Sequence, residues 1–479
     1  MGPGILAIDQ GTSGTKALVV DECGEVLSCA EIPVSLHALG DGGVQQDPRE
    51  LLESVLAAGR QAIAESSVEV VAAGLANQGE TVLAWDGSTG EALSPAISWQ
   101  DRRSADFVAT LAEHEARLTQ ITGLPLDPYF IAPKLRWLKD RSPSGARVTS
   151  LDAWLNWHLI ARAVTDVATA SRSLVLDLDT RTWSEEAAGI FGLDVAAFPE
   201  IVTNAADFGV TNVFGPKLSL NALIVDQQAA LLGERCRVRG EAKCTYGTGA
   251  FFLVNCGSTP IHSNHRLSAS VAWETPDELA YCLDGQVYSA GSAVDWLVRL
   301  GLLSSSRELD TVGRDVRSSS LVTCVPSFAG LGAPLWEPRA SAHFEGIDLS
   351  TTSTDIVWSV LDGIACQVAS VVVASESDVG VPLEVLRVDG GLSASQLLMQ
   401  HQADVLQRPV EVFVSPHATA LGVVELVRRG VGLAPLAVDE LATGQRFEPR
   451  MAASESLERR ERWSAAAARA ADAASKGVR

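Results

Sequence analysis

Residues 5–20 read ILAIDQGTSGTKALVV, two short apolar runs joined by a polar turn of small residues. This pattern predicts a β-hairpin, because strands favour branched apolar residues and glycine permits a tight turn. Small residues also let the backbone fold around an anion, with amide and hydroxyl groups pointing inward. Lys16 can add one positive charge, and the carboxylate of Asp9 can hold a hydrated Mg²⁺. A plain polar turn is the alternative, and the spacing of a Walker A loop is absent.

Two later segments also combine apolar runs with a glycine turn. Residues 242–255 contain the turn TYGTG at 245–249, and residues 385–393 contain DGG at 389–391. We expect strand, turn and strand in each, and the likeness of 242–255 to the first hairpin suggests an internal duplication. Each turn alone is also compatible with an ordinary chain reversal. Three such turns spread over both halves of the chain together indicate a nucleotide held in a cleft between two domains.

Other segments predict a further strand and two helices. Residues 68–75 form an apolar run that ends at the polar cluster 77–81, and functional loops often follow strands in this way. Thr352 and Asp355 make a capping box before a helix whose apolar residues keep helical spacing. From about residue 457 onward the chain is rich in alanine and arginine, which predicts a terminal helix with frayed last residues.

The composition predicts two or three domains and a cytoplasmic location. The chain has 479 residues, of which 47% are hydrophobic and 20% charged, and is too long for one ordinary domain. Its eight cysteines lack metal-site or disulfide spacing, which fits reduced thiols. Neither a signal sequence nor a run of about 18 uncharged apolar residues is visible, so we expect no membrane partner. A formal net charge of −22 opposes binding to nucleic acid.

Short blocks along the chain add a more specific indication. They read DQGT at 9–12, SWQDRR at 98–103, DPYF at 127–130, DQQAAL at 226–231, YGTG at 246–249, GLGAPLW at 330–336 and DGG at 389–391. In this order they resemble the glycerol kinase branch of the FGGY family of carbohydrate kinases. Residues 342–362 are similar to the second FGGY signature. Residues 129–138 are similar to the first, except that Ile131 stands where a small residue is usual.

The resemblance implies an α/β chain with two ribonuclease-H-like domains of the actin/hexokinase/chaperone ATPase type and an interdomain cleft. The N-terminal domain, residues 1–235, is expected to carry the substrate side and the phosphate loop. The C-terminal domain, residues 236–479, is expected to carry the nucleotide side and to end in the terminal helix. The implied reaction is phosphorylation of a small polyol, glycerol or a related alditol, with ATP and Mg²⁺ as cofactors. The expected assembly is a homodimer or homotetramer.

The resemblance also implies roles for individual residues. Asp226 matches the catalytic aspartate, and a carboxylate near the attacking hydroxyl suits a general base, although an N-cap of a helix is the alternative. The residues implied at the polyol are Glu80, Trp99, Tyr129, Asp226, Gln227 and Phe251, although each aromatic alone is more typical of a core. The residues implied at the nucleotide are Thr12, Ser13, Gly14, Lys16, Thr248, Gly291, Gly391 and Ser395, with Asp9 at the metal.

One departure from the family pattern concerns the substrate. Glycerol kinases carry an arginine before the glutamate of this block, whereas Gly79 precedes Glu80 here. The change removes several hydrogen-bond donors and leaves volume that a longer polyol could occupy. A ketopentose such as xylulose or ribulose is therefore an alternative substrate. An actin-like or chaperone-like ATPase is a further alternative, in which Trp99, Glu80 and Asp226 would have no purpose.

Overall fold

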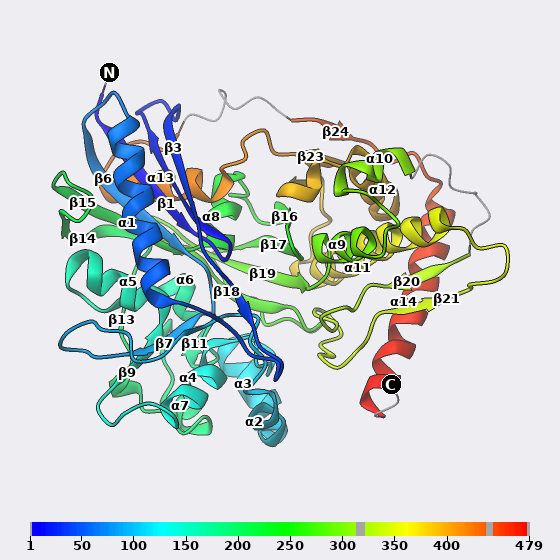
Figure 1. The fold of residues 1–479 in the computed structure, drawn as a ribbon, viewed down its shortest axis with the longest axis horizontal. Coiled ribbons are helices and arrows are strands. Elements are labelled where there is room, and N and C mark those ends of the chain that lie inside the picture. The colour runs from blue at the N-terminus through cyan, green and yellow to red at the C-terminus, as the bar shows by residue number, and fades with distance from the viewer. Residues whose placement is uncertain (1, 313–320, 437–443, 477–479) are drawn as a thin grey trace.

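Two large mixed β-sheets, each covered by helices, form the centre of the molecule (Figure 1). The computed structural model describes residues 2–312, 321–436 and 444–476. The strand order is β14-β15-β6-β1-β2-β3 in the first sheet and β18-β19-β17-β16-β22-β23-β24 in the second. The first sheet is complete before the chain enters the second, so each sheet is built from its own part of the sequence.

The two sheets share one pattern of strand directions. The first contains β1 (Gly4–Gln10), β2 (Gly14–Val20), β3 (Val26–Pro33), β6 (Val70–Asn77), β14 (Ala205–Thr211) and β15 (Leu218–Val225). The second contains β16 (Ala242–Tyr246), β17 (Ala250–Gly257), β18 (Ser268–Glu274), β19 (Leu279–Val287), β22 (Leu386–Asp389), β23 (Val410–Val412) and β24 (Arg446–Phe447). In each, three antiparallel strands (β1-β2-β3 or β16-β17-β19) are followed by two parallel ones (β6 and β15, or β22 and β23). The repeated pattern agrees with the suggested duplication.

The predicted hairpins at 5–20 and 242–255 are confirmed. Strands β1 and β2 pair antiparallel with Asp9 opposite Lys16, and the amide of Gly11 donates to the carbonyl of Gly14 at 3.0 Å. Gly14 must be glycine for a packing reason, because a Cβ atom there would lie 2.8 Å from the carbonyl oxygen of Ile32 on β3. The phosphate loop predicted from the sequence is thus the tip of a hairpin held down by the third strand.

The third predicted strand-turn-strand unit, at 385–393, is wrong in its second half. After β22 the chain forms a 3-10 turn over Gly391–Ala394 and continues into the helix α12 (Gln396–Leu406). The reason is topological, because β22 and its neighbour β23 are parallel and parallel strands require a crossover, here a helix. Gly390, with φ of 89°, lies so close to the backbone of Tyr246 that no side chain fits there.

Two helices connect the sheets. Helix α8 (Asp226–Gly233) follows β15 directly, and α13 (Ala418–Gly430) packs against α8, β1, β6 and β15 (Figure 1). Although α13 comes from the C-terminal part of the sequence, its apolar face therefore covers the first sheet. On the other face of that sheet lies α1 (Pro48–Glu65), which packs on β1, β2 and β3.

The predicted capping box and terminal helix are both present. Helix α11 (Ser353–Val379) begins at a capping box in which Thr352 and Asp355 bond each other's backbone amides. Helix α11 is long and apolar enough to cross a membrane by length and composition, but 78% of its most apolar window is buried in the protein. It packs on α12, on the second sheet and on α14 (Ala453–Ser475), so it is a core helix. The predicted fraying at the end involves residues 477–479, which lie outside the described ones.

Smaller elements complete the described part of the chain. The short strands are β4 (His37–Ala38), β5 (Val44–Gln46), β7 (Val82–Trp85), β8 (Ala96–Ile97), β9 (Arg147–Ser150), β10 (Val164–Asp166), β11 (Leu176–Asp177), β12 (Thr182–Trp183), β13 (Glu200–Val202), β20 (Thr323–Val325) and β21 (His343–Glu345). The remaining α-helices are α2 (Ala105–Thr110), α3 (Glu115–Thr122), α4 (Ile131–Lys139), α5 (Leu151–Ile160), α6 (Val167–Ala170), α7 (Glu185–Ile190), α9 (Gly291–Arg299) and α10 (Leu309–Val312). All eight cysteines are free thiols.

Candidate active site

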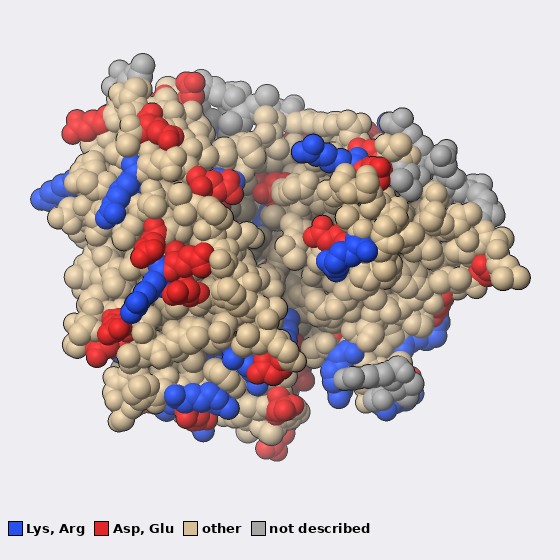
Figure 2. All heavy atoms as spheres, in the orientation of Figure 1, with Lys and Arg blue, Asp and Glu red and all other residues tan. Residues whose placement is uncertain are grey.

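A cavity of about 350 Å³ lies where the two sheets meet, and a groove between the two halves is visible in the space-filling view (Figure 2). The cavity is lined by residues from both halves of the chain, which include Thr12, Ser13, Gly79, Glu80, Trp99, Tyr129, Arg172, Asp226, Gln227, Gln228, Thr248, Phe251, Asp284 and Gln286. All six residues that the sequence predicted for the polyol are in this set. Their positions in the sequence span 80 to 251, so only the tertiary fold brings them together.

Asp226 stands at the junction of a strand and a helix. Strand β15 ends at Val225, which occupies the N-cap position of α8, so Asp226 is the first helical residue and not the cap. Its Oδ1 accepts a hydrogen bond from the amide of Gln227 at 2.7 Å. Burial raises the pKa of Asp226 to about 7; the carboxyls of Asp9 and Glu80 add to the rise, and Lys243 opposes it. A half-buried carboxyl that titrates near neutrality and faces a cavity suits a general base.

An aromatic wall borders the cavity beside this carboxyl. The ring centroid of Trp99 lies 5.9 Å from that of Tyr129 and 5.6 Å from that of Phe251, and both contacts are edge-to-face. The indole Nε1 of Trp99 donates to Oγ1 of Thr12 at 2.9 Å, so the wall is tied to the hairpin tip. Apolar ring faces with a fixed orientation suit the carbon chain of a small polar ligand.

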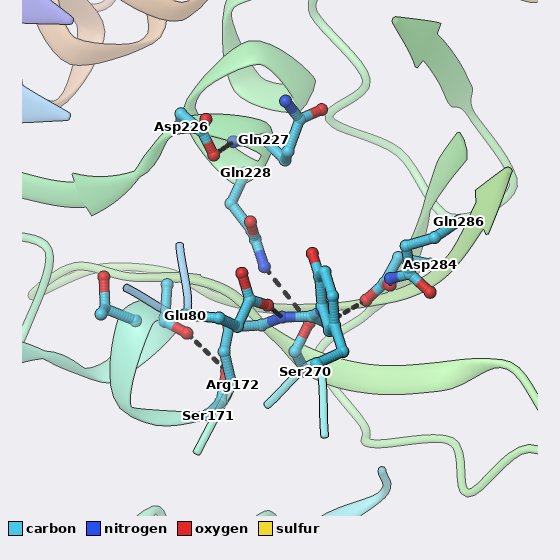
Figure 3. A network of polar contacts seen from close by, with 12 residues as sticks. Glu80, Ser171, Arg172, Asp226, Gln227, Gln228, Ser270, Asp284 and Gln286 are labelled. Carbon is cyan, nitrogen blue, oxygen red and sulfur yellow. Dashed lines mark hydrogen bonds and ion pairs between the residues drawn. The ribbon is translucent and has the colours of Figure 1, made fainter. Parts of the chain in front are cut away.

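A buried ion network closes the cavity opposite Asp226. The guanidinium of Arg172 donates from Nε to Glu80 at 2.6 Å and from Nη1 to Asp284, and all three side chains are at most 5% exposed (Figure 3). Glu80 adopts a left-handed backbone conformation with φ of 54°, which costs energy for a residue other than glycine. The ion pair between Glu80 and Arg172 ties this strained loop to the network.

A second cavity, of about 620 Å³, lies beside the first in the C-terminal half. It is lined by Gly247, Thr248, Gly291, Val294, Asp295, Ser306, Arg307, Asp310, Gly391, Leu392, Ala394 and Ser395. Gly247 and Thr248 line both cavities, so the loop at 247–249 is the partition between them. The start of α9 holds that loop, because the amides of Ala290 and Ser292 both donate to the carbonyl of Thr248 at 3.0 Å.

The residues predicted for the nucleotide fall into four groups. Thr12 and Ser13 line the first cavity, Gly291, Gly391 and Ser395 line the second, and Thr248 lines both. Ser395 also caps α12 and donates to Oδ1 of Asp310 at 2.6 Å. Gly14 and Lys16 lie outside the lining of both cavities. The ammonium group of Lys16 is 4.0 Å from Glu31, on the neighbouring strand.

Asp9 lies at the end of β1. Burial raises its pKa to about 6, with Lys16 opposing the rise and Asp389, across in the second sheet, adding to it. Among the described residues no cluster of three or more His, Cys, Asp or Glu side chains could hold a metal ion by itself. A divalent ion near Asp9 would therefore take most of its ligands from water and phosphate, as Mg²⁺ commonly does.

Sequence reasoning missed four polar residues of this region, namely Arg172, Lys243, Asp284 and Gln286. Lys243 is fully buried and donates from Nζ to Gln227 Oε1 at 2.6 Å and to Thr245 Oγ1 at 2.7 Å. A signal was available, because Arg172 is the only charged residue between 167 and 176, and Asp284 interrupts an apolar strand. A charge within an apolar run needs a buried partner, which marks it as a candidate.

The chain resembles known proteins in sequence and in fold. Two family models match: the N-terminal domain of the FGGY family of carbohydrate kinases over residues 4–233, and its C-terminal domain over residues 242–427. A glycerol kinase from Thermus brockianus is 39% identical over 469 residues, covering 93% of this chain and 94% of that protein. The crystal structure of Plasmodium falciparum glycerol kinase with ADP gives a TM-score of 0.89 at 30% identity over 98% of both chains. Ligand-bound xylulose kinase from Lactobacillus acidophilus, 19% identical with a TM-score of 0.85 over 99% of both chains, shares the fold.

Proposed function

The chain belongs to the FGGY family of carbohydrate kinases and is an ATP-dependent kinase, and we propose that it phosphorylates a hydroxyl of a small polyol, glycerol or a related alditol. The observation that carries the proposal is the partition loop at 247–249. A nucleotide in the second cavity can present its terminal phosphate past Thr248 to the first cavity, which Asp226 lines. Phosphoryl transfer needs this alignment more than it needs covalent chemistry from the protein.

In this proposal the polyol lies in the first cavity, with its carbon chain against Trp99 and Phe251. Asp226 accepts the proton of the attacking hydroxyl, whose oxygen forms the new bond to the γ-phosphorus. The bond from that phosphorus to the bridging oxygen of ADP breaks, and ADP leaves. Gln227 is held by Lys243 and is placed to bond a neighbouring hydroxyl of the polyol.

The nucleotide side follows the same logic. Thr12 and Ser13 at the hairpin tip face the terminal phosphates, while Gly291, Gly391 and Ser395 face the nucleoside end. We assign Asp9 to a hydrated Mg²⁺, because its carboxylate is a hard oxygen ligand in a region with other carboxylates and little positive charge. Bound there, the ion would neutralise phosphate charge. Lys16 stays in the proposal as a nearby positive charge without direct contact to the cavity.

An assay of ADP release, coupled to a colour reaction, tests the proposal with glycerol, tetritols, pentitols and ketopentoses as acceptors. We expect Asp226→Asn to lower kcat about a hundredfold or more while ATP binding persists, as removal of a general base should. Asp152→Asn is the matched control, because burial also raises the pKa of Asp152 to about 7, yet Asp152 lines neither cavity. ADP release that no acceptor stimulates, or equal loss in both variants, would refute the assignment.

A further inference from the structure

One residue that lines the first cavity has a buried polar atom without a partner among the described residues. Gln286, on β19, is 2% exposed and lines the cavity, and its Oε1 lacks any hydrogen bond. The orientation of this amide is fixed, because its Nε2 donates to Oδ1 of Asp284. Asp284 in turn accepts from Arg172 through its other oxygen. A buried oxygen that is held in place and left without a donor is costly, and a ligand donor would remove that cost.

Several hydrogen-bond donors around the cavity already have acceptors within the protein. Nε and Nη1 of Arg172 donate to Glu80 and Asp284, and Nε2 of Gln228 donates to Ser270 at 3.3 Å. The indole of Trp99 donates to Thr12. The acceptors that remain are the oxygen of Gln286 and the carboxyl of Asp226. A ligand that bonds both of these acceptors must bring donors of its own, which hydroxyl groups supply and a carbonyl or a carboxylate does not.

The balance of charge points the same way. Three carboxyl groups, those of Glu80, Asp226 and Asp284, line the cavity together with the single guanidinium of Arg172. Arg172 is already paired with two of them. An anionic group at this end of a substrate would be repelled and would find no unpaired cation among the described residues that line the cavity, so sugar acids are disfavoured.

The free oxygen also lies away from the site of phosphoryl transfer. In Figure 3, Asp226 and Gln227 lie at the start of α8, Asp284 and Gln286 lie on a strand to one side, and Arg172 reaches from beside Glu80 toward Asp284. Gly79 lines the cavity without a side chain, and a Cβ atom there would touch only Val225, at 3.0 Å. The cavity therefore extends from the proposed base toward Gln286.

We propose that Gln286 is a specificity-determining residue that accepts a hydrogen bond from a hydroxyl remote from the phosphorylated one, so that the substrate is a neutral alditol of four or five carbons. This inference rests on the proposed polyol kinase activity. In this proposal a three-carbon polyol placed at Asp226 does not extend to Gln286, and the amide oxygen stays unpaired. A site built to bond a hydroxyl discriminates strongly against the analogue that lacks it.

The first test needs no variant. With the full-length protein and ATP, kcat/KM for the best tetritol or pentitol is expected to exceed that for glycerol by about tenfold or more. The stereoisomers of each length are compared separately, because they direct their hydroxyl groups differently. A kcat/KM for glycerol equal to or above that of every longer alditol overturns the inference while leaving the polyol kinase intact. A preference for a ketopentose or a sugar acid also overturns it.

The second test removes the amide. Gln286→Met is expected to lower kcat/KM about tenfold for the preferred alditol, mainly through KM, and to lower it much less for glycerol. Gln367→Met is the matched control, a buried glutamine on α11 that lines neither cavity. Equal loss for all acceptors, or no loss for the preferred one, overturns the role of Gln286. If no polyol stimulates ADP release at all, the proposed function itself fails, which is a distinct outcome.

Discussion

At the scale of single residues, the environment of Asp226 is the most informative feature. Its carboxyl faces a cavity, yet burial and two neighbouring carboxyls hold its pKa far above that of a free aspartate. Lys243 moderates this rise and at the same time fixes Gln227 and Thr245. One buried cation thus lowers the pKa of the proposed base and also holds two nearby side chains in position.

The raised pKa predicts how activity depends on pH. A general base acts only when ionised, so kcat/KM should rise with pH up to about 7 and then level off, falling about tenfold per unit on the acid side. Because Asp9 titrates close by, with a pKa of about 6, the observed value belongs to the coupled group. A pH profile of kcat/KM for the polyol at saturating ATP measures this apparent pKa.

The control for this profile is Asp226→Asn, whose residual activity should lose the acid limb. Asp152→Asn should keep the limb of the unmodified protein. A profile that is flat between pH about 5.5 and about 8 in the unmodified enzyme would contradict the assignment of Asp226 as the base.

At the scale of elements, the crossing of α8 and α13 decides where Asp226 lies. Each helix contributes a glycine to the contact, Gly233 and Gly422, and neither has room for a side chain. A Cβ atom at Gly422 would lie 1.9 Å from the carbonyl oxygen of Ala229, and one at Gly233 would lie 1.9 Å from that of Ala418. The helix that carries the proposed base is therefore in direct backbone contact with a helix from the C-terminal part of the chain.

Gly422→Ala is accordingly expected to destabilise the fold by about 1–3 kcal/mol, because the two backbones must move apart. Since α8 carries Asp226 at its start, kcat should fall as well. Gly189→Ala on α7 is the matched control, because a Cβ atom there meets nothing within 4 Å and alanine favours the helix by about 0.5–1 kcal/mol. Urea unfolding measures the stability of both variants. Equal stability would show that the two helices can separate to admit a side chain without loss of free energy.

At the scale of the whole molecule, two similar sheets meet at the first cavity, which agrees with the predicted two-domain fold of the actin and hexokinase type. The first cavity takes its walls from both halves, and the partition loop joins it to the second. The chain has a formal net charge of −22. The carboxyl groups of Asp9, Asp226 and Asp389 lie near the place proposed for the phosphates. The protein alone supplies few cations to balance an ATP anion.

Removal of divalent metal is therefore expected to abolish turnover and to weaken ATP binding about tenfold or more, because unneutralised phosphate meets a negative surface. Titration calorimetry with ATP in chelator, and then with Mg²⁺ restored, measures the binding independently of activity. ATP binding of equal strength in both conditions would contradict the proposed role of the divalent metal.

The sequence alone predicted features that depend on neighbouring residues. The hairpins at 5–20 and 242–255 and the capping box at Thr352 follow from local patterns of apolar and small residues, because backbone geometry restricts such segments to few conformations. The family motifs added Asp226 and the polyol residues, all of which line one cavity.

The tertiary structure alone decided what depends on distant partners. Arg172 bonds Glu80, 92 residues away, and Asp284, 112 residues away, and no local pattern specifies such a pairing. The same holds for the contact of α13 with α8 and for the unpaired oxygen of Gln286. Burial removes water as an alternative partner, so the free energy of each polar group is set by whichever segment packs against it.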